Sequence, residues 1–210
     1  LFCDAQRKQS IKHFVSRNAM DIDGLGDKLV DLLVDEGLIH DVGDIYRLQY
    51  EDLFALDRMA EKSANNLLNA IEKSKQTSLP RFLYALGIPQ VGETTAGVLA
   101  NHFRKLENIQ SASSEELQSL EDVGPIVAQD VMVFFKQSHN LEVIRNLVSA
   151  GVHWPAIEKQ EQPDSGIKGK TFVLTGTMTL LTRNDAKAAL QAKGAKVTGS
   201  VSARTVYVVV

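Results

Sequence analysis

The sequence predicts a mainly α-helical fold, a tandem array of four helix-hairpin-helix units, followed by a linker and a partial α/β domain. Three observations predict it: a short pattern that recurs four times, an apolar helical face after each copy, and a change to strand-like periodicity near the end of the chain. A pattern repeated at nearly constant spacing is typical of stacked supersecondary units.

Each copy of the pattern is an apolar residue, two polar or turn-forming residues, a second apolar residue, and then Gly or Ala. The copies are 22–26, 56–60, 88–92 and 120–124, so their closing residues are 34, 32 and 32 positions apart. Small apolar residues follow four positions after each copy, at Val30, Ala64, Ala96 and Ala128. Larger ones follow after seven positions, at Leu33, Leu67, Leu99 and Val131. This spacing predicts a helix with one buried face just after each small residue.

The other elements follow from periodicity and from capping residues. We expect helices at 6–16, 27–36, 61–76, 93–105, 125–137 and 139–150, and one that begins after Ser78 and ends at Gly87. Residues 44–60 resemble 108–124, displaced by 64 positions, which indicates a duplicated pair of hairpins. After 169 the pattern predicts strands at 171–175, 196–198 and 205–210 around a helix at 183–193 with Ala186, Ala189 and Leu190 on one face, arranged as a parallel sheet.

Composition divides the chain into four regions. Residues 1–20 form a basic segment, 21–154 the hairpin array, 155–168 a polar linker, and 169–210 the partial α/β domain. The single cysteine rules out an internal disulfide and suits a reducing, cytoplasmic location. No apolar run approaches membrane-spanning length, so we expect no membrane partner. The first residue is Leu, and the last stretch, 206–210, stops inside an expected strand. We therefore expect a piece of a longer protein.

The small residue that closes each pattern predicts a phosphate-binding site. The first amides of a helix have no intrahelical partner and lie at the positive end of its dipole, which favours an anion. A glycine there lets a ligand backbone come close. The candidate nucleic-acid contacts are Gly24, Gly26, Ala60, Gly92 and Gly124.

Charge argues in the opposite direction. Residues 165–210 contain seven basic side chains and one acidic one, and residues 1–20 contain four and one. Because the whole chain has a charge of −3, residues 21–164 carry −12. DNA-binding regions are normally basic. Either the hairpins hold phosphate through oriented amides, or the array is a scaffold for protein interactions.

Several stretches resemble the C-terminal half of bacterial NAD-dependent DNA ligases. They are residues 2–8, 13–17, 20–26, 82–88 and 151–155, and the order of the modules matches along the entire chain. Residues 169–176 and 194–197 resemble the first half of a BRCT domain. The resemblance implies a part of an enzyme that seals nicks in duplex DNA during replication and repair. It also implies that the hairpins grip the duplex backbone across the minor groove without reading sequence.

The resemblance assigns NAD, Mg and Zn to the intact enzyme. Adenylation occurs on a lysine in N-terminal domains, so we expect no catalytic residue in this fragment, no bound cofactor and no ligation by it alone. Cys3 matches the fourth ligand of a zinc finger whose other three ligands are absent here, so we expect that site to be empty. The expected partners are nicked double-stranded DNA and the enzyme's own N-terminal domains, with the chain a monomer.

Two further expectations concern the partial α/β domain. Thr175 and Gly176, at the end of the first strand, match a phosphate-binding position of phosphopeptide-binding BRCT relatives, although a strand end that only packs is the alternative. A sheet that stops at Val210 should leave apolar surface exposed. The rival functions are a non-enzymatic nucleic-acid or protein scaffold and a base-excision glycosylase, which would require a catalytic group such as Asp130 in a pocket.

Overall fold

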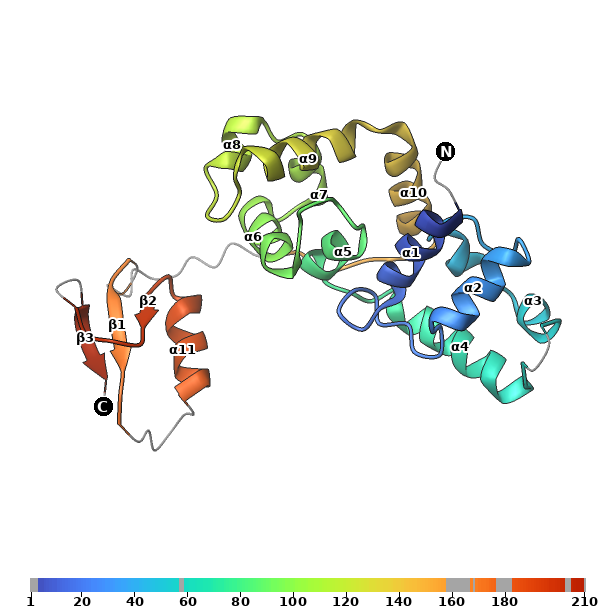
Figure 1. Ribbon diagram of the computed structural model, residues 1–210, viewed down its shortest axis with the longest axis horizontal. Coiled ribbons are helices and arrows are strands. Elements are labelled where there is room, and N and C mark those ends of the chain that lie inside the picture. Colours follow the sequence, from blue (N-terminus) through green and yellow to red (C-terminus); the bar gives the residue numbers. More distant parts are fainter. Residues whose placement is uncertain are drawn as a thin grey trace. The chain divides into compact units, whose positions relative to one another are not determined.

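The computed structural model describes residues 4–56, 59–157, 167, 169–176, 183–202 and 205–209, and it divides into two compact units, 1–158 and 159–210 (Figure 1). Cys3, Val210 and most of the predicted linker lie outside the described residues. The two units are described separately.

The first unit is helical, as predicted. Its helices are α1 (Asp4–Val15), α2 (Asp27–Asp35), the 3-10 helix η1 (Asp44–Arg47), α3 (Tyr50–Phe54), α4 (Glu61–Ser74), α5 (Leu79–Ala85), α6 (Glu93–Phe103), α7 (Leu106–Gln110), α8 (Ser114–Gln118), α9 (Pro125–Lys136) and α10 (Ser138–Ser149). The expected helix at 61–76 ends two residues early, because Gln76 leaves it to pair with His153 in a short parallel bridge. Ser78 caps α5 as expected, its hydroxyl accepting from the Arg81 amide at 3.4 Å.

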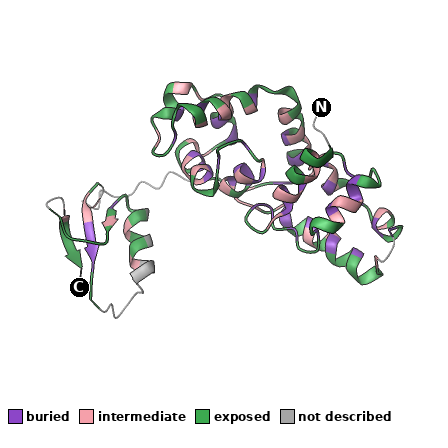
Figure 2. Cartoon of the chain, in the orientation of Figure 1, coloured by how far each residue is buried: buried purple, intermediate pink, exposed green. Residues whose placement is uncertain are grey.

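The repeated helical face is confirmed and forms the centre of the core. Val30, Ala64, Ala96 and Ala128 are each 0 % exposed. Their partners one turn later, Leu33, Leu67, Leu99 and Val131, are at most 2 % exposed. Figure 2 shows the buried positions along the helices of this unit. The spacing that defines the repeat is therefore the spacing of the residues that the fold removes from water.

The duplication is also visible in the structure. The segment η1–α3 and the segment α7–α8 occupy equivalent places before the second and the fourth hairpin. Their matched apolar residues, Ile45 with Ile109 and Leu53 with Leu117, are all at most 1 % exposed. The helices that flank each hairpin contact one another: α1 with α2, α3 with α4, α5 with α6, and α8 with α9.

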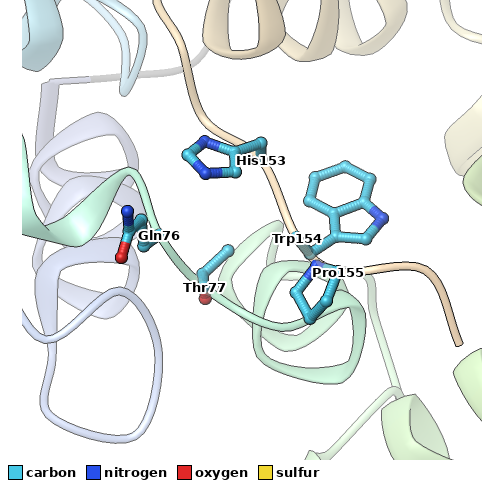
Figure 3. A pocket seen from close by; sticks show the side chains of 5 residues that line it. All are labelled: Gln76, Thr77, His153, Trp154 and Pro155. Atoms are coloured by element: carbon cyan, nitrogen blue, oxygen red, sulfur yellow. The ribbon is translucent and has the colours of Figure 1, made fainter.

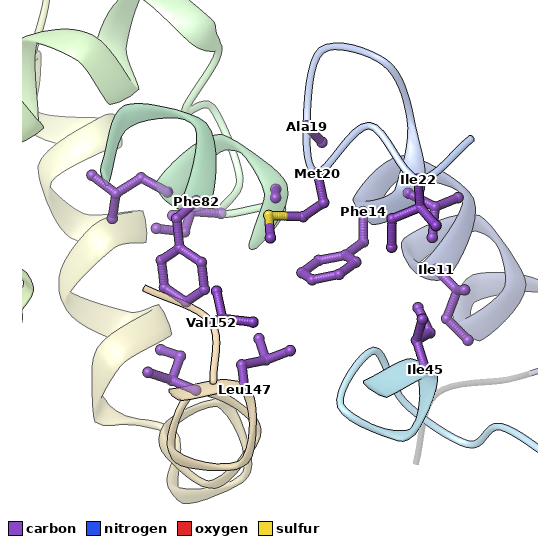
Figure 4. Close-up of a cluster of buried hydrophobic side chains, with 14 of the residues drawn as sticks. Ile11, Phe14, Ala19, Met20, Ile22, Ile45, Phe82, Leu147 and Val152 are labelled. Carbon is purple, nitrogen blue, oxygen red and sulfur yellow. The ribbon is translucent and has the colours of Figure 1, made fainter. Parts of the chain in front are cut away.

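One core joins the two pairs of hairpins. Phe14 of α1 and Met20 face Phe82 of α5, while Leu147 of α10 and Val152 complete the cluster (Figure 4). All five side chains are at most 3 % exposed. The returning segment after α10 then pairs with the end of α4, where the His153 amide donates to the Lys75 carbonyl at 2.8 Å. The four hairpins are thus carried by one continuous body.

The second unit is the predicted parallel sheet. It contains β1 (Thr171–Leu174), α11 (Arg183–Ala192), β2 (Lys196–Thr198) and β3 (Thr205–Val209), and the strands run in the order β2-β1-β3, both neighbours parallel to β1. The expected helix is present as α11, and of the three residues predicted on one face, Ala186 and Leu190 are half-buried and Ala189 is exposed. Among the described elements, helix α11 packs chiefly on the edge strand β2.

The expected exposure of apolar residues at the end of the sheet is confirmed. The central strand β1 is buried from Phe172 to Leu174, whereas β3 exposes four successive apolar residues: Val206, Tyr207, Val208 and Val209. The aromatic ring of Tyr207 stacks on the ring of Phe172 in β1, with the ring centroids 4.9 Å apart.

Candidate nucleic-acid interface

The four hairpins share one hydrogen bond. In each, the amide of the fourth residue donates to the carbonyl of the first: Leu25 to Ile22 (3.2 Å), Met59 to Leu56 (3.2 Å), Val91 to Ile88 (3.0 Å) and Val123 to Leu120 (3.3 Å). The apolar residues of the pattern therefore close a four-residue turn. Most of these side chains are buried, which anchors the turns to the core, and the middle residues of the first, third and fourth turns are exposed.

The third residue of the turn needs a left-handed backbone. Gly24 has φ +85°, and Gln90 and Asp122 have φ +61° and +64°. The corresponding residue of the second hairpin, Arg58, lies outside the described residues. Gly24 is therefore favoured by the turn itself, since a side chain in this region costs about 1–2 kcal/mol. Gln90 and Asp122 sit in the same conformation with that cost.

The fifth residue of each hairpin is the N-cap of the next helix. Gly26, Ala60, Gly92 and Gly124 have φ between −77° and −82° with an extended ψ, all are exposed, and none has a side chain that caps the helix. Among the described residues, the amides of Gly26, Asp27 and Lys28 donate to no protein acceptor, and the equivalent amides of the other hairpins share this state, except at Pro125, which has no amide hydrogen. Each hairpin thus presents unpaired donors at the positive end of a helix.

The fold does not require glycine at this position. A Cβ built at Gly26, Gly92 or Gly124 meets nothing within 4 Å, and their φ values are open to any residue. Ala60 occupies the position in the second hairpin. The glycines that closely resemble one another in the sequence therefore have different reasons: Gly24 serves the turn, whereas Gly26, Gly92 and Gly124 leave space in front of free amides.

The side chains at the helix starts differ between hairpins. The first residue of the helix is acidic and exposed at Asp27, Glu61 and Glu93, and it is Pro125 in the fourth hairpin, where one amide is lost. An acidic residue there stabilises the helix dipole but repels a phosphate. These carboxylates weaken the attraction that the amides provide.

The second residue of each helix is a candidate that the sequence reasoning missed. It is Lys28 in the first hairpin, Lys62 in the second, Thr94 in the third and Ile126 in the fourth, and all four are exposed. Neither lysine has an ion-pair partner among the described residues. Aligning the four copies to their closing residues would have revealed the position. Because this residue is Ile126 in the fourth hairpin, that hairpin has neither a cation nor a hydroxyl at the position, and the isoleucine side chain is 73 % exposed.

A shallow pocket of about 360 Å³ lies elsewhere, where the returning segment meets the end of α4 (Figure 3). Gln76, Thr77, His153, Trp154 and Pro155 line it. The His153 ring nitrogen Nδ1 is paired with the Gly151 carbonyl at 2.8 Å, and the Thr77 amide donates to the His153 carbonyl. The pocket therefore lies where two backbone segments of the fold pair with each other. Asp130 is not among its lining residues, and it lies inside α9.

The remaining candidates fall at the edge of the described structure. The Thr175 amide donates to the Val209 carbonyl at 2.8 Å, so only the exposed hydroxyl of Thr175 is left for a ligand, and Gly176 follows it with φ +75°. Within the described ranges, no three His, Cys, Asp or Glu residues are grouped to hold a metal ion, and no helix is long and apolar enough to cross a membrane.

Three family models match the chain. Residues 16–73 match a SAM-like helix-hairpin-helix tandem and include the first two hairpins, and residues 81–144 match a helix-hairpin-helix motif and include the other two. Residues 166–210 match the BRCT (BRCA1 C Terminus) domain. The two helix-hairpin-helix models therefore cover all four turns.

A DNA ligase from Nitrosococcus oceani is 55 % identical to the chain over all 210 residues, which make up 31 % of that protein. The chain thus spans about a third of the length of this relative. By sequence, it is a homologue of part of a DNA ligase, with two helix-hairpin-helix regions followed by a BRCT segment.

Proposed function

We propose that this chain is the DNA-binding C-terminal portion of an NAD-dependent DNA ligase and grips the backbone of nicked duplex DNA without reading its sequence. One observation carries the proposal: repeated helix starts present free amides, and glycines that the fold does not need keep the space before them open. Backbone amides at a helix start are suited to phosphate oxygens, and phosphates are the same at every sequence.

The hairpins are unequal in this proposal. The first combines three free amides with Lys28, whereas the fourth has Pro125 and Ile126 in place of an amide and a cation, and Glu121 and Asp122 in its turn. We expect phosphate contacts to be strongest at the first hairpin and weakest at the fourth. The acidic balance of the region predicts modest affinity that depends on few phosphates.

The chemistry of sealing belongs, in this proposal, to the rest of the ligase. NAD, Mg and Zn act in its N-terminal domains, and Cys3 completes a zinc site only there. No step assigned to this chain uses these groups, and the chain alone is expected to bind duplex without joining it. We place the protein in the cytoplasm, as a monomer that works with its own N-terminal ligase domains.

The proposal is tested by titrating a fluorescent nicked duplex with the chain at several salt concentrations. Wild-type protein should bind with an affinity that falls as salt rises, to a similar extent for unrelated sequences. Gly26→Val and Gly92→Val should each weaken binding about tenfold, because the added side chain stands between the phosphate and the amides. Their melting temperatures should fall only modestly, since the Cβ has free space and valine is merely a poorer N-cap than glycine.

Gly97→Val is the matched control for Gly92→Val. Gly97 lies in the same helix, five residues further on, and a Cβ there also meets nothing within 4 Å. This variant should bind DNA as the wild type does. Absence of duplex binding by the wild type, or unchanged affinity in both hairpin variants, would reject the proposal in favour of the protein-interaction scaffold that the charge of −12 suggests.

A further inference from the structure

The loop between α1 and the first hairpin is held by a side chain from far along the sequence. Arg81, in the first turn of α5, donates from Nε to the Ala19 carbonyl at 2.9 Å and from an Nη2 to the Arg17 carbonyl at 2.7 Å. The same nitrogen lies 4.0 Å from a carboxylate oxygen of Asp21. Asp21 itself has φ +54°, immediately before the first hairpin.

Arg81 is the donor that these carbonyls depend on. Within the described part of the chain, neither the Arg17 nor the Ala19 carbonyl accepts another hydrogen bond. Ala19 is fully buried, and a buried carbonyl left without a donor is costly. The planar guanidinium fits two acceptors at once, which an ammonium on a flexible stem does less well.

A second tie joins this loop to the third hairpin. The Asn18 side-chain amide donates to a Glu93 carboxylate oxygen at 2.8 Å. Glu93 is the first residue of α6, directly after Gly92. The loop that leads into the first hairpin therefore contacts α5, which leads into the third hairpin, and α6, which leaves it.

From these contacts we propose that Arg81 is a positioning residue that fixes the first and third hairpins relative to one another, so that both engage one duplex together. This inference rests on the proposed function, because it concerns how the two phosphate-binding hairpins cooperate. Two contacts held in a fixed geometry bind far more tightly than two independent ones, since the second contact becomes intramolecular. Phe14 and Met20 pack with Phe82 in the core that connects the two pairs of hairpins. Arg81 then holds the loop after α1 through its hydrogen bond to the Ala19 carbonyl.

The test compares Arg81→Met with Arg81→Lys in the full chain. Met keeps the apolar stem and removes the donors, whereas Lys keeps the charge and loses the fork. Positioning predicts that both variants bind the nicked duplex at least about tenfold more weakly than the wild type, with a shallower salt dependence. Wild-type affinity for Arg81→Lys with a loss only in Arg81→Met would show that Arg81 acts through its charge, and would overturn the inference.

A double-mutant cycle supplies a readout that a purely stabilising residue would not move. In the wild type, Gly26→Val and Gly92→Val should be strongly non-additive, because losing either hairpin removes the joint grip. In the Arg81→Met background the two losses should become additive. Unchanged non-additivity, with melting curves that confirm a folded protein, would overturn the inference.

Hydrogen exchange without DNA separates this inference from the proposed function. In the wild type, the amides of Ala19, Met20 and Asp21 donate to carbonyls of α1 and its end, and they should exchange slowly. Arg81→Met should raise their exchange rates about tenfold and leave those of α9 unchanged. If exchange responds in this way but wild-type chain does not bind duplex, the proposed function fails and the positioning contact stands. If exchange does not respond, the positioning role fails, whatever the DNA result.

Discussion

At the scale of single residues, two glycines of the first hairpin look alike in sequence and act differently. Gly24 occupies a left-handed backbone conformation that the turn imposes, and a side chain there strains the turn. Gly26, two residues on, has an ordinary extended backbone with free space around it. A substitution at Gly24 therefore reports on folding, and only a substitution at Gly26 reports on the interface.

Tyr46 gives a residue-scale prediction about pH. Burial raises the pKa of Tyr46 from 10.0 to about 12, and the hydrogen bond with the Ser74 hydroxyl, at 3.0 Å, offsets part of that rise. Because the folded pKa is the higher one, the unfolded chain loses its proton first, and stability falls as pH rises from 10 to 12. This rise in the pKa of Tyr46 corresponds to a loss of about 2–3 kcal/mol in the free energy of unfolding.

Urea unfolding at several alkaline pH values measures this loss, with Tyr46→Phe as the comparison. The Phe variant lacks the phenol, so its stability should fall less steeply over the same interval. Equal slopes for the two proteins would mean that other groups govern alkaline unfolding.

At the scale of the element, each hairpin helix begins with two opposed demands. An acidic first residue stabilises the helix through its dipole, and the same charge repels a phosphate at that end. We predict that Asp27→Asn lowers the stability of the protein by about 0.3–1 kcal/mol and raises its affinity for duplex DNA about two- to fivefold. Chemical denaturation and fluorescence anisotropy measure the two effects.

Glu36→Gln is the matched control for this change. Glu36 is the exposed C-cap of the same helix, α2, so the substitution removes an equal charge at the opposite end. It should change duplex affinity less than Asp27→Asn does, and it should not lower stability, because a negative charge is unfavourable at a helix C-terminus. If both variants gained affinity equally, overall charge and not the helix start would control binding.

At the scale of the whole molecule, the helical unit depends on the joint between its two pairs of hairpins. Phe82 is fully buried there, and its ring packs against Trp154 with centroids 4.6 Å apart. Phe82→Ala should lower the free energy of unfolding by about 3–5 kcal/mol, the usual cost of removing a buried aromatic ring. Trp154 is the single tryptophan of the chain, so its fluorescence follows unfolding directly.

The expected transition is one cooperative loss of structure in all four hairpins, since one core connects them. A Val148→Ala substitution, at an exposed position of α10, should leave the transition close to that of the wild type. A Phe82→Ala protein that melts in two steps, with the first pair of hairpins surviving, would contradict a shared core.

The repeat could be recognised from the amino-acid sequence alone, because burial recurs with the helical period and each copy carries its own turn, cap and apolar face. The pattern placed four residues in the core without coordinates: Val30, Ala64, Ala96 and Ala128. The strand pattern likewise predicted the parallel sheet of the second unit. The phosphate-binding role of the closing residues remains a prediction from the same local pattern.

Which residues act together became clear only from the folded chain. Arg81 and Ala19 are 62 positions apart, and no pattern in the sequence around either residue predicts their hydrogen bond. Local patterns report the conformation of a segment, whereas the spacing between hairpins depends on packing between distant segments, which a single sequence does not display.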